Sequence, residues 1–152
     1  MKKRVLISVS DKTDILDLAK ELQTFGYDIV STGNTCKYLV ENGICAQEVS
    51  SVTNFNEILN GKVKTLHPKI FGGILNRRDN TTDCQQVQQY AIPSIDLVIV
   101  DLYPFVDTVA SGASDAEIIE KIDIGGISLI RAAAKNYNDV IIVASKAQYA
   151  PL

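Results

Sequence analysis

The residues best suited to chemistry lie in a basic segment, residues 58–78, which contains no acidic residue although the net charge of the chain is −3. Its cations are Lys62, Lys64, Lys69, Arg77 and Arg78. They are interleaved with Thr65, His67-Pro68 and Gly72-Gly73. These residue types fix the backbone geometry of a segment and are not typical of a merely solvated, charged surface. The proline favours extended or turn backbone before it. We therefore predict a loop that binds an anionic substrate, with His67, a lone histidine, in a structural role.

Two polar turns follow the first two predicted strands and could together hold a phosphate group. They span residues 8–13 and 31–35. Hydroxyls and backbone N–H groups at a helix N-terminus form an anion site, and Gly33 allows close backbone approach. One such turn alone is explained by a helix cap from Ser10 or Asp11, whereas two in parallel positions are as consistent with a shared phosphate pocket as with two separate turns. The residues expected at the phosphate are Ser10, Lys12, Thr13, Ser31, Gly33 and Thr35.

A tyrosine and an aspartate follow later elements at positions where they could take part in proton transfer. Tyr103 comes soon after a predicted strand, where ligands bind in open α/β sheets; alternatively, it fills the edge of the core. Asp123 is flanked by isoleucines, which is a costly setting for an unpaired carboxylate. Arg131 and Lys135 are four residues apart and therefore share one helix face. Beside a phosphate pocket, such groups can perform acid–base chemistry.

The elements that must position these residues alternate between strand and helix. Short apolar, β-branched runs predict strands at residues 4–9, 27–31, 95–100 and 140–144. Helical patterns lie at residues 13–25, 35–42, 82–90, 115–122 and 128–135. Strands that are apolar almost throughout suit a parallel sheet covered on both faces. We therefore predict an α/β fold, a three-layer sandwich around a mostly parallel sheet.

Length and composition exclude several classes of protein. The chain has 152 residues, of which 46% are hydrophobic and 22% charged, as expected for one globular domain over residues 1–152. A slightly acidic chain is not expected to bind nucleic acid, and without an apolar run of about 18 residues it is not expected to span a membrane. Three cysteines without a CxxC pair predict no disulfide framework and no metal site. Without a signal-peptide pattern, we expect a cytoplasmic protein.

Several of these segments together resemble the IMP cyclohydrolase domain, the N-terminal part of the bifunctional purine-biosynthesis proteins. The resemblance covers essentially the whole chain. Its motifs are SVSDKT (8–13), STGNT (31–35), KVKTLHPKI (62–70), DLYPF (101–105), IDIGG (122–126) and SLIRAAAKN (128–136). The combination of KTLHP, IDIGG and RAAAKN is very specific. It implies a methylglyoxal-synthase-like fold; the formyltransferase domain of the family is not expected within residues 1–152.

The resemblance implies an enzyme that closes the ring of the formamido ribotide FAICAR to give IMP and water. It implies a homodimer and no metal or cofactor. The matching catalytic positions are Lys64, Tyr103, Asp123 and Lys135. Further expected substrate contacts are Thr65, Gly125, Gly126 and Lys62, which stands where many relatives have arginine. On this basis we expect Lys64 to support the oxyanion, Asp123 to position the carboxamide, and Lys135 with Tyr103 to relay protons.

The chain departs from the family pattern at a few positions. Asn34 and Cys36 stand where glycine and alanine are common, Phe71 replaces a histidine, and Asp101 replaces an asparagine. Because Asp101 adds a negative charge near a site for an anionic ligand, we expect its side chain to point away. Other functions remain open on the same fold: a methylglyoxal-synthase-type lyase, a non-catalytic module that binds a phosphorylated regulator, and a catalytically silent fragment.

Overall fold

A computed structural model describes residues 2–152, in which strands and helices alternate. The strands are β1 (Arg4–Ser8), β2 (Asp28–Ser31), β3 (Ala46–Glu48), β4 (Leu97–Val100) and β5 (Ile141–Val143). The α-helices are α1 (Ile15–Thr24), α2 (Gly33–Glu41), α3 (Val49–Thr53), α4 (Pro68–Leu75), α5 (Thr81–Gln89), α6 (Phe105–Ala110), α7 (Asp115–Glu120) and α8 (Gly125–Lys135). A 3₁₀-helix, Lys146–Gln148, follows β5. No helix of the described part is long and apolar enough to cross a membrane.

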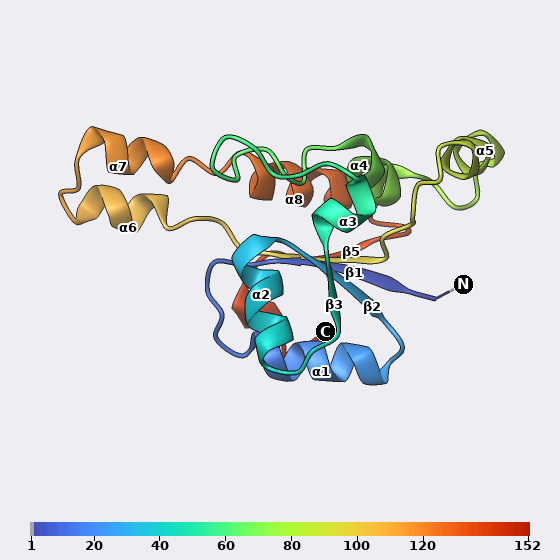
Figure 1. The fold of residues 1–152 in the computed structure, drawn as a ribbon, viewed down its shortest axis with the longest axis horizontal. Helices are drawn as coiled ribbons and strands as arrows, with labels where there is room; N and C mark the ends of the chain where they lie inside the picture. The colour runs from blue at the N-terminus through green and yellow to red at the C-terminus, as the bar shows by residue number, and fades with distance from the viewer. Residues whose placement is uncertain (1) are drawn as a thin grey trace.

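The described strands form one sheet in the order β3-β2-β1-β4-β5, and every neighbouring pair is parallel. Helices α1 and α2 cover one face, whereas α3, α4 and α8 cover the other (Figure 1). Side chains of β1 alternate between the two layers: Val5 and Ile7 pack with α1 and α2, whereas Leu6 packs with α4 and α8. The predicted three-layer α/β sandwich is confirmed, and its sheet is parallel throughout residues 2–152.

The predicted strands and helices are all present, with ends that differ by a few residues. The sequence patterns above do not predict β3, α3, α4 or α6, and α8 begins three residues earlier than expected, at Gly125. The extra turn of α8 matters for function because it brings the backbone N–H groups of the IDIGG segment to the start of a helix.

Helix α4 occupies part of the basic segment that we predicted to be a substrate loop, so that prediction is wrong for Pro68–Leu75. His67 accepts a hydrogen bond at Nδ1 from the backbone N–H of Lys69 (3.1 Å), and Pro68 is the first helical residue. Ile70 and Ile74, four residues apart, are fully buried in the layer that packs on the sheet. The structural role predicted for His67 is confirmed, because its ring caps this helix.

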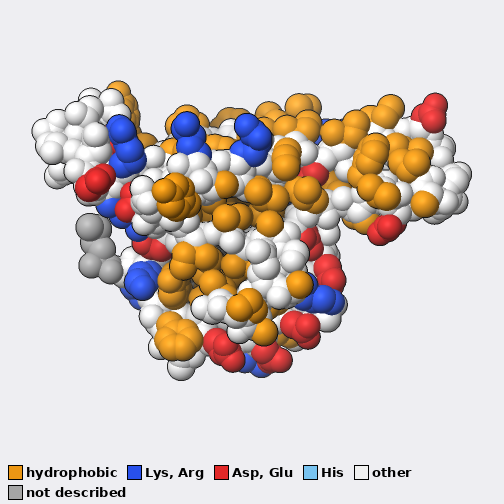
Figure 2. Space-filling model, turned by 180° about the vertical axis from the view of Figure 1, so that it is seen from behind, with side chains coloured by type: hydrophobic (Ala, Val, Ile, Leu, Met, Phe, Trp, Pro, Cys, Tyr) orange, Lys and Arg blue, Asp and Glu red, His pale blue; other side chains and the backbone are white. Residues whose placement is uncertain are grey.

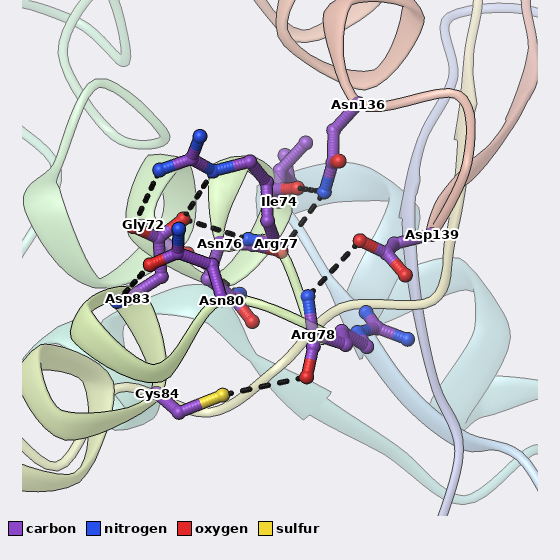
Figure 3. A network of polar contacts seen from close by, with 10 residues as sticks. All are labelled: Gly72, Ile74, Asn76, Arg77, Arg78, Asn80, Asp83, Cys84, Asn136 and Asp139. Atoms are coloured by element: carbon purple, nitrogen blue, oxygen red, sulfur yellow. Dashed lines mark hydrogen bonds and ion pairs between the residues drawn. The ribbon is translucent and has the colours of Figure 1, made fainter.

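The two arginines of the basic segment form ion pairs away from any substrate loop. Arg77 pairs with Asp83 at 2.9 Å (Figure 3), and this contact lowers the pKa of the Asp83 carboxyl to about 2. Arg78 pairs with Asp96 at 2.6 Å. Both arginines therefore hold the end of α4 to neighbouring structure. Lys69 donates to the carbonyl oxygen of Val52 (3.1 Å), so the cations of the basic segment that are left for a ligand are Lys62 and Lys64.

Asn136, the last residue of the RAAAKN segment, is a structural residue. Its side-chain amide is buried and donates hydrogen bonds to the carbonyl oxygens of Ile74 (2.8 Å) and Asn76 (2.9 Å), as Figure 3 shows. These bonds satisfy carbonyls at the end of α4 that have no partner within the helix. The ends of α4 and α8 are thereby fixed to one another.

Candidate active site

A cleft of about 650 Å³ lies at the carboxyl ends of β1 and β4, next to the N-terminal ends of α2 and α8. This is where open α/β sheets usually bind ligands. The predicted site residues that line it are Ser10, Lys12, Thr35, Lys62, Lys64, Thr65, Tyr103, Asp123, Gly125 and Gly126. Those that do not line it are Thr13, Ser31, Gly33 and Lys135.

Four lysines line the cleft, and two of them, Lys12 and Lys64, lie near the turns that follow β1 and β2. The Lys64 ammonium lies beside the turn at the start of α2, 3.8 Å from the position that a Cβ on Gly33 would occupy. The Lys12 ammonium donates hydrogen bonds to the carbonyl oxygens of Val9 and Ser10. Burial lowers the pKa of Lys12, and the charge of Lys64 lowers it further, against the opposing effect of Asp101. The two cations are thus close enough to act on one ligand.

The predicted phosphate turns divide into residues that shape the cleft and residues that face it. The Ser31 hydroxyl is fully buried and donates to the carbonyl oxygen of Ile7 (2.7 Å). The Thr35 hydroxyl donates to the carbonyl oxygen of Val9 (2.8 Å), which ties α2 to the end of β1. Gly33 has a φ of +37°, which favours glycine, and its N–H donates to Glu48 at 3.1 Å. Ser31 and Gly33 therefore contribute backbone geometry.

Thr13 is also a shaping residue. Its hydroxyl and its backbone N–H both donate to Asp11, at 2.6 and 2.9 Å. These bonds hold the turn before α1 and lower the pKa of the Asp11 carboxyl. Thr13 is thus held by Asp11 in a local turn before the helix. The helix cap from Ser10 or Asp11 that we gave as the alternative is wrong, because the residue before α1 is Asp14, whose side chain makes no capping hydrogen bond.

The side chain of Asp101 does not point away from the first turn, contrary to our expectation. Its carboxylate accepts hydrogen bonds from the backbone N–H groups of Ser10 (2.6 Å) and Asp11 (2.8 Å), and it lines the cleft. Two adjacent N–H groups beyond the end of β1 form an anion-binding concavity, and an internal carboxylate satisfies them. In this structure the two N–H donors of the turn are occupied by a carboxylate of the protein itself.

Asp123 is held at the N-terminus of α8. Its Oδ1 accepts a hydrogen bond from the N–H of Gly126 (2.6 Å), and its Oδ2 accepts one from the N–H of Tyr103 (3.2 Å). A negative charge is stabilised at this end of a helix. The approach requires glycine, because a Cβ on Gly126 would lie only 2.7 Å from Oδ1. The cost of a carboxylate between isoleucines is thus offset by two donors, and free lone pairs remain for a ligand.

Tyr103 stands at the mouth of the cleft, about two-fifths exposed. Burial raises the pKa of its phenol, and the nearby carboxylates of Asp123 and Asp101 raise it further. The phenol therefore stays protonated at neutral pH, so it is suited to donate a proton and not to act as a phenolate base. The ammonium of Lys121 lies 5.8 Å from the centre of its ring.

Two lysines that we predicted at the active site, Lys62 and Lys135, lie away from the centre of the cleft. Lys62 forms an exposed ion pair with Glu120 at 2.9 Å, on the rim of the cleft. Lys135 is exposed at the last position of α8, ten residues after Gly125. At 1.5 Å per residue, this places it about 15 Å from the cleft end of the helix. Lys135 is therefore remote from the cleft of its own chain.

The structure adds residues to the cleft that the sequence did not single out. They are Asn60, Gly61, Ile119, Glu120 and Lys121, besides backbone at the strand ends. They come from the turn before Lys62 and from the C-terminal end of α7, and no local pattern marks them. No group of three or more His, Cys, Asp or Glu side chains suited to a metal ion occurs within residues 2–152.

The arrangement joins an anion-binding end to a proton-transfer end. Lys12 lies on the side of the α2 turn, whereas Asp123 and Tyr103 lie on the side of α8. The Lys64-Thr65 segment reaches both sides, because the Lys64 ammonium lies beside Gly33 and the Thr65 hydroxyl lies 3.2 Å from the position that a Cβ on Gly125 would occupy. A phosphorylated ligand that spans the cleft would present its distant part to a carboxylate, a phenol and an ammonium group. These are the groups that acid–base chemistry at a carbonyl requires.

Fold and cleft together define an MGS-like domain, and the chain belongs to this family, whose model matches residues 14–128. Within the family, the chain corresponds to the N-terminal part of the bifunctional purine biosynthesis protein PurH. It is 61% identical over 150 residues to PurH of Bacteroides thetaiotaomicron, a match that covers 99% of this chain and 30% of that protein. The predicted resemblance is confirmed.

Other relatives agree with this placement. PurH of Clostridioides difficile is 56% identical over 149 residues, which are 98% of this chain and 29% of that protein. The crystal structure of ForH superposes with a TM-score of 0.82 at 32% identity, over 98% of this chain and 75% of that one. The chain thus spans about three-tenths of the length of the PurH relatives that it matches.

Proposed function

We propose that this domain is an IMP cyclohydrolase, which closes FAICAR to IMP with release of water. The observation that carries the proposal is the meeting of Lys64, Tyr103 and Asp123 in one cleft with a cationic end formed by Lys12 and the α2 turn. Kinship to PurH proteins, which are named for purine biosynthesis, supports a nucleotide substrate.

The reaction is intramolecular, so it depends more on how the two reacting groups are positioned than on a strong acid, base or nucleophile of the protein. The carboxamide nitrogen attacks the formyl carbon, so a C–N bond forms and the carbonyl oxygen becomes an oxyanion. The C–O bond then breaks, and the oxygen leaves as water with one proton from the carboxamide nitrogen and one from the formamide nitrogen. Because nucleophile and electrophile belong to one molecule, holding them in a near-attack geometry supplies much of the acceleration.

The scheme assigns roles to several side chains of the cleft. The 5′-phosphate is bound by Lys12 and by the N-terminal end of α2, where Asn34 and Thr35 line the cleft. Lys64 stabilises the oxyanion. Asp123 accepts a hydrogen bond from the carboxamide and fixes the attacking nitrogen. Tyr103 stays protonated, because its pKa is raised, and donates to the departing oxygen.

The test is incubation of the purified chain with FAICAR while IMP formation is followed by absorbance. We expect turnover that saturates with FAICAR and is strongly reduced in Asp123→Asn, which keeps the shape of the side chain but removes its charge. Binding of IMP without turnover would instead indicate a non-catalytic module that recognises a phosphorylated regulator. Release of phosphate from a triose phosphate would indicate a lyase of the methylglyoxal-synthase type.

A further inference from the structure

A short hairpin, residues 58–63, lies in the connection between α3 and α4, and its turn lines the cleft. Ile58 and Val63 form an antiparallel bridge, with backbone hydrogen bonds of 3.1 and 3.4 Å. None of the hairpin residues is buried. Exposed apolar side chains gather over α6 and α7 (Figure 2), and the hairpin exposes two more, Ile58 and Leu59. The hairpin is therefore held by its own hydrogen bonds and not by packing into the core.

The turn of this hairpin has an unusual backbone. Three consecutive residues, Leu59, Asn60 and Gly61, have φ values of +53°, +55° and +77°. This left-handed region is costly for leucine, and the Leu59 side chain is 67% exposed, so burial offsets little of that cost. Strained backbone persists where the surrounding structure requires the geometry that it gives, and it is frequent at functional sites. The strain in this turn therefore points to the residues that the hairpin brings together.

The residues that flank the hairpin are a carboxylate and an ammonium group. Glu57 and Lys64 stand directly outside the bridged pair, one on each strand, so the hairpin sets them opposite one another. Their charged ends meet between two glycines. Glu57 Oε2 and Lys64 Nζ lie 3.6 and 3.8 Å from the position of a Cβ on Gly33, and 3.5 and 3.3 Å from that of a Cβ on Gly61. Both charged atoms are therefore within 3.8 Å of the same point beside the start of α2.

Neither of these two charges is taken up by another ion pair. Within residues 2–152, Glu57 and Lys64 form no direct ion pair, either with other residues or with one another. Other lysines of the cleft are engaged: Lys12 donates to backbone carbonyl oxygens, and Lys62 pairs with Glu120. The flexible stem of a lysine can close a short gap to a carboxylate. Glu57 is thus available as the counter-charge of Lys64.

We propose that Glu57 is a positioning residue of the cleft, which holds the Lys64 ammonium at the turn that begins α2, and that the hairpin fixes the register in which the two residues meet. This role rests on the proposed function, because it concerns the lysine to which the oxyanion is assigned. Without a counter-charge, the flexible lysine stem would sample many orientations, and the repulsion between Lys64 and Lys12 would drive the two cations apart. With Glu57 beside it, Lys64 is in place before the oxyanion forms.

Glu57→Gln distinguishes this role from a merely structural one, because it keeps the shape of the side chain and removes its charge. We expect kcat with FAICAR to fall about tenfold. The affinity for IMP should stay the same or rise a few-fold, since a negative charge near the phosphate is removed. Glu57→Asp, which keeps the charge, should restore part of kcat. The matched control is Glu41→Gln, in an exposed pair with Lys37 at the other end of α2, which should change neither quantity.

A double-mutant cycle with Lys64→Ala tests whether Glu57 acts through Lys64. In the Lys64→Ala background, Glu57→Gln should change kcat by less than about twofold, because the group that it positions is gone. A tenfold loss that persists without Lys64 would overturn the proposal. A Glu57→Gln variant with normal kcat, or one that loses kcat and IMP affinity together with thermal stability, would overturn it as well.

Labelling of the ligand-free chain with an acylating reagent tests the pairing without any measurement of activity. The reagent reacts with the uncharged amine, whereas a nearby carboxylate favours the ammonium form. Glu57→Gln should therefore raise the labelling rate of Lys64 several-fold relative to that of Lys20 on α1, as read by mass spectrometry. Faster labelling of Lys64 in a chain that never forms IMP would refute the proposed function and leave the pairing intact. Unchanged labelling of Lys64 would refute the pairing even in an active enzyme.

Discussion

Replacing Lys64 by alanine is the most informative single perturbation of the cleft. An ammonium about 4 Å from an oxyanion, in a medium of effective dielectric constant near 20, contributes about 4 kcal/mol, which corresponds to roughly a thousandfold in rate. The cleft is open to water and Lys12 remains nearby, so the loss is smaller than this limit. We expect kcat to fall by roughly 10²–10³, as for other oxyanion donors, with KM nearly unchanged.

Lys62→Ala is the matched control, because Lys62 is two residues away and pairs with Glu120 on the exposed rim. An exposed pair contributes about 1 kcal/mol or less. This variant should therefore raise KM a few-fold and leave kcat nearly alone. Steady-state kinetics with FAICAR decide between the two outcomes, with thermal unfolding as a check on the fold. If Lys64→Ala keeps a near-normal kcat and raises KM, Lys64 contacts only the phosphate or ribose and its oxyanion role is wrong.

Four further variants test individual contacts. Asp101→Asn removes a charge repulsion of about 1 kcal/mol toward the ligand phosphate, so calorimetry should show about fivefold tighter IMP binding; weaker binding would mean that the carboxylate is needed to shape the turn. Gly126→Ala should abolish most activity, because its Cβ would displace Asp123; normal kcat would contradict the role of that carboxylate. Asn136→Ala leaves two carbonyls unpaired and should lower the free energy of unfolding by about 1–3 kcal/mol in urea, with IMP affinity unchanged. Tyr103→Phe should lower kcat with little effect on KM. Because the pKa of Tyr103 lies above its usual 10, kcat of the parent chain should show no loss from Tyr103 deprotonation up to that pH.

The sheet was predictable because its strands are runs of β-branched residues with no polar interruption. β3 was not, since its residues Ala46–Glu48 are partly exposed and too few to form a pattern. Helix α4 was missed because the glycines in it suggested a loop. They serve close packing instead: a Cβ on Gly72 would lie 2.9 Å from Ile92, and one on Gly73 would overlap the carbonyl oxygen of Pro93.

The cleft was largely predictable because its residues follow strands or precede helices. The orientation of the Asp101 side chain was predicted wrongly, because the prediction considered only its charge. The two N–H donors that bind its carboxylate come from the turn at Ser10 and Asp11, which is far away in the sequence. The sequence pattern predicted that Lys135 lies on a helix and on the same face as Arg131. It did not predict how far Lys135 lies from the cleft, because that distance depends on where α8 begins, at Gly125.

The most direct test of the account is the conversion of FAICAR by the purified parent chain, followed at the absorbance of IMP, beside the Lys64→Ala and Lys62→Ala variants. The account predicts saturable formation of IMP by the parent, a large loss of kcat for Lys64→Ala, and nearly full kcat for Lys62→Ala. Absence of IMP formation by a folded parent chain that still binds IMP would contradict it.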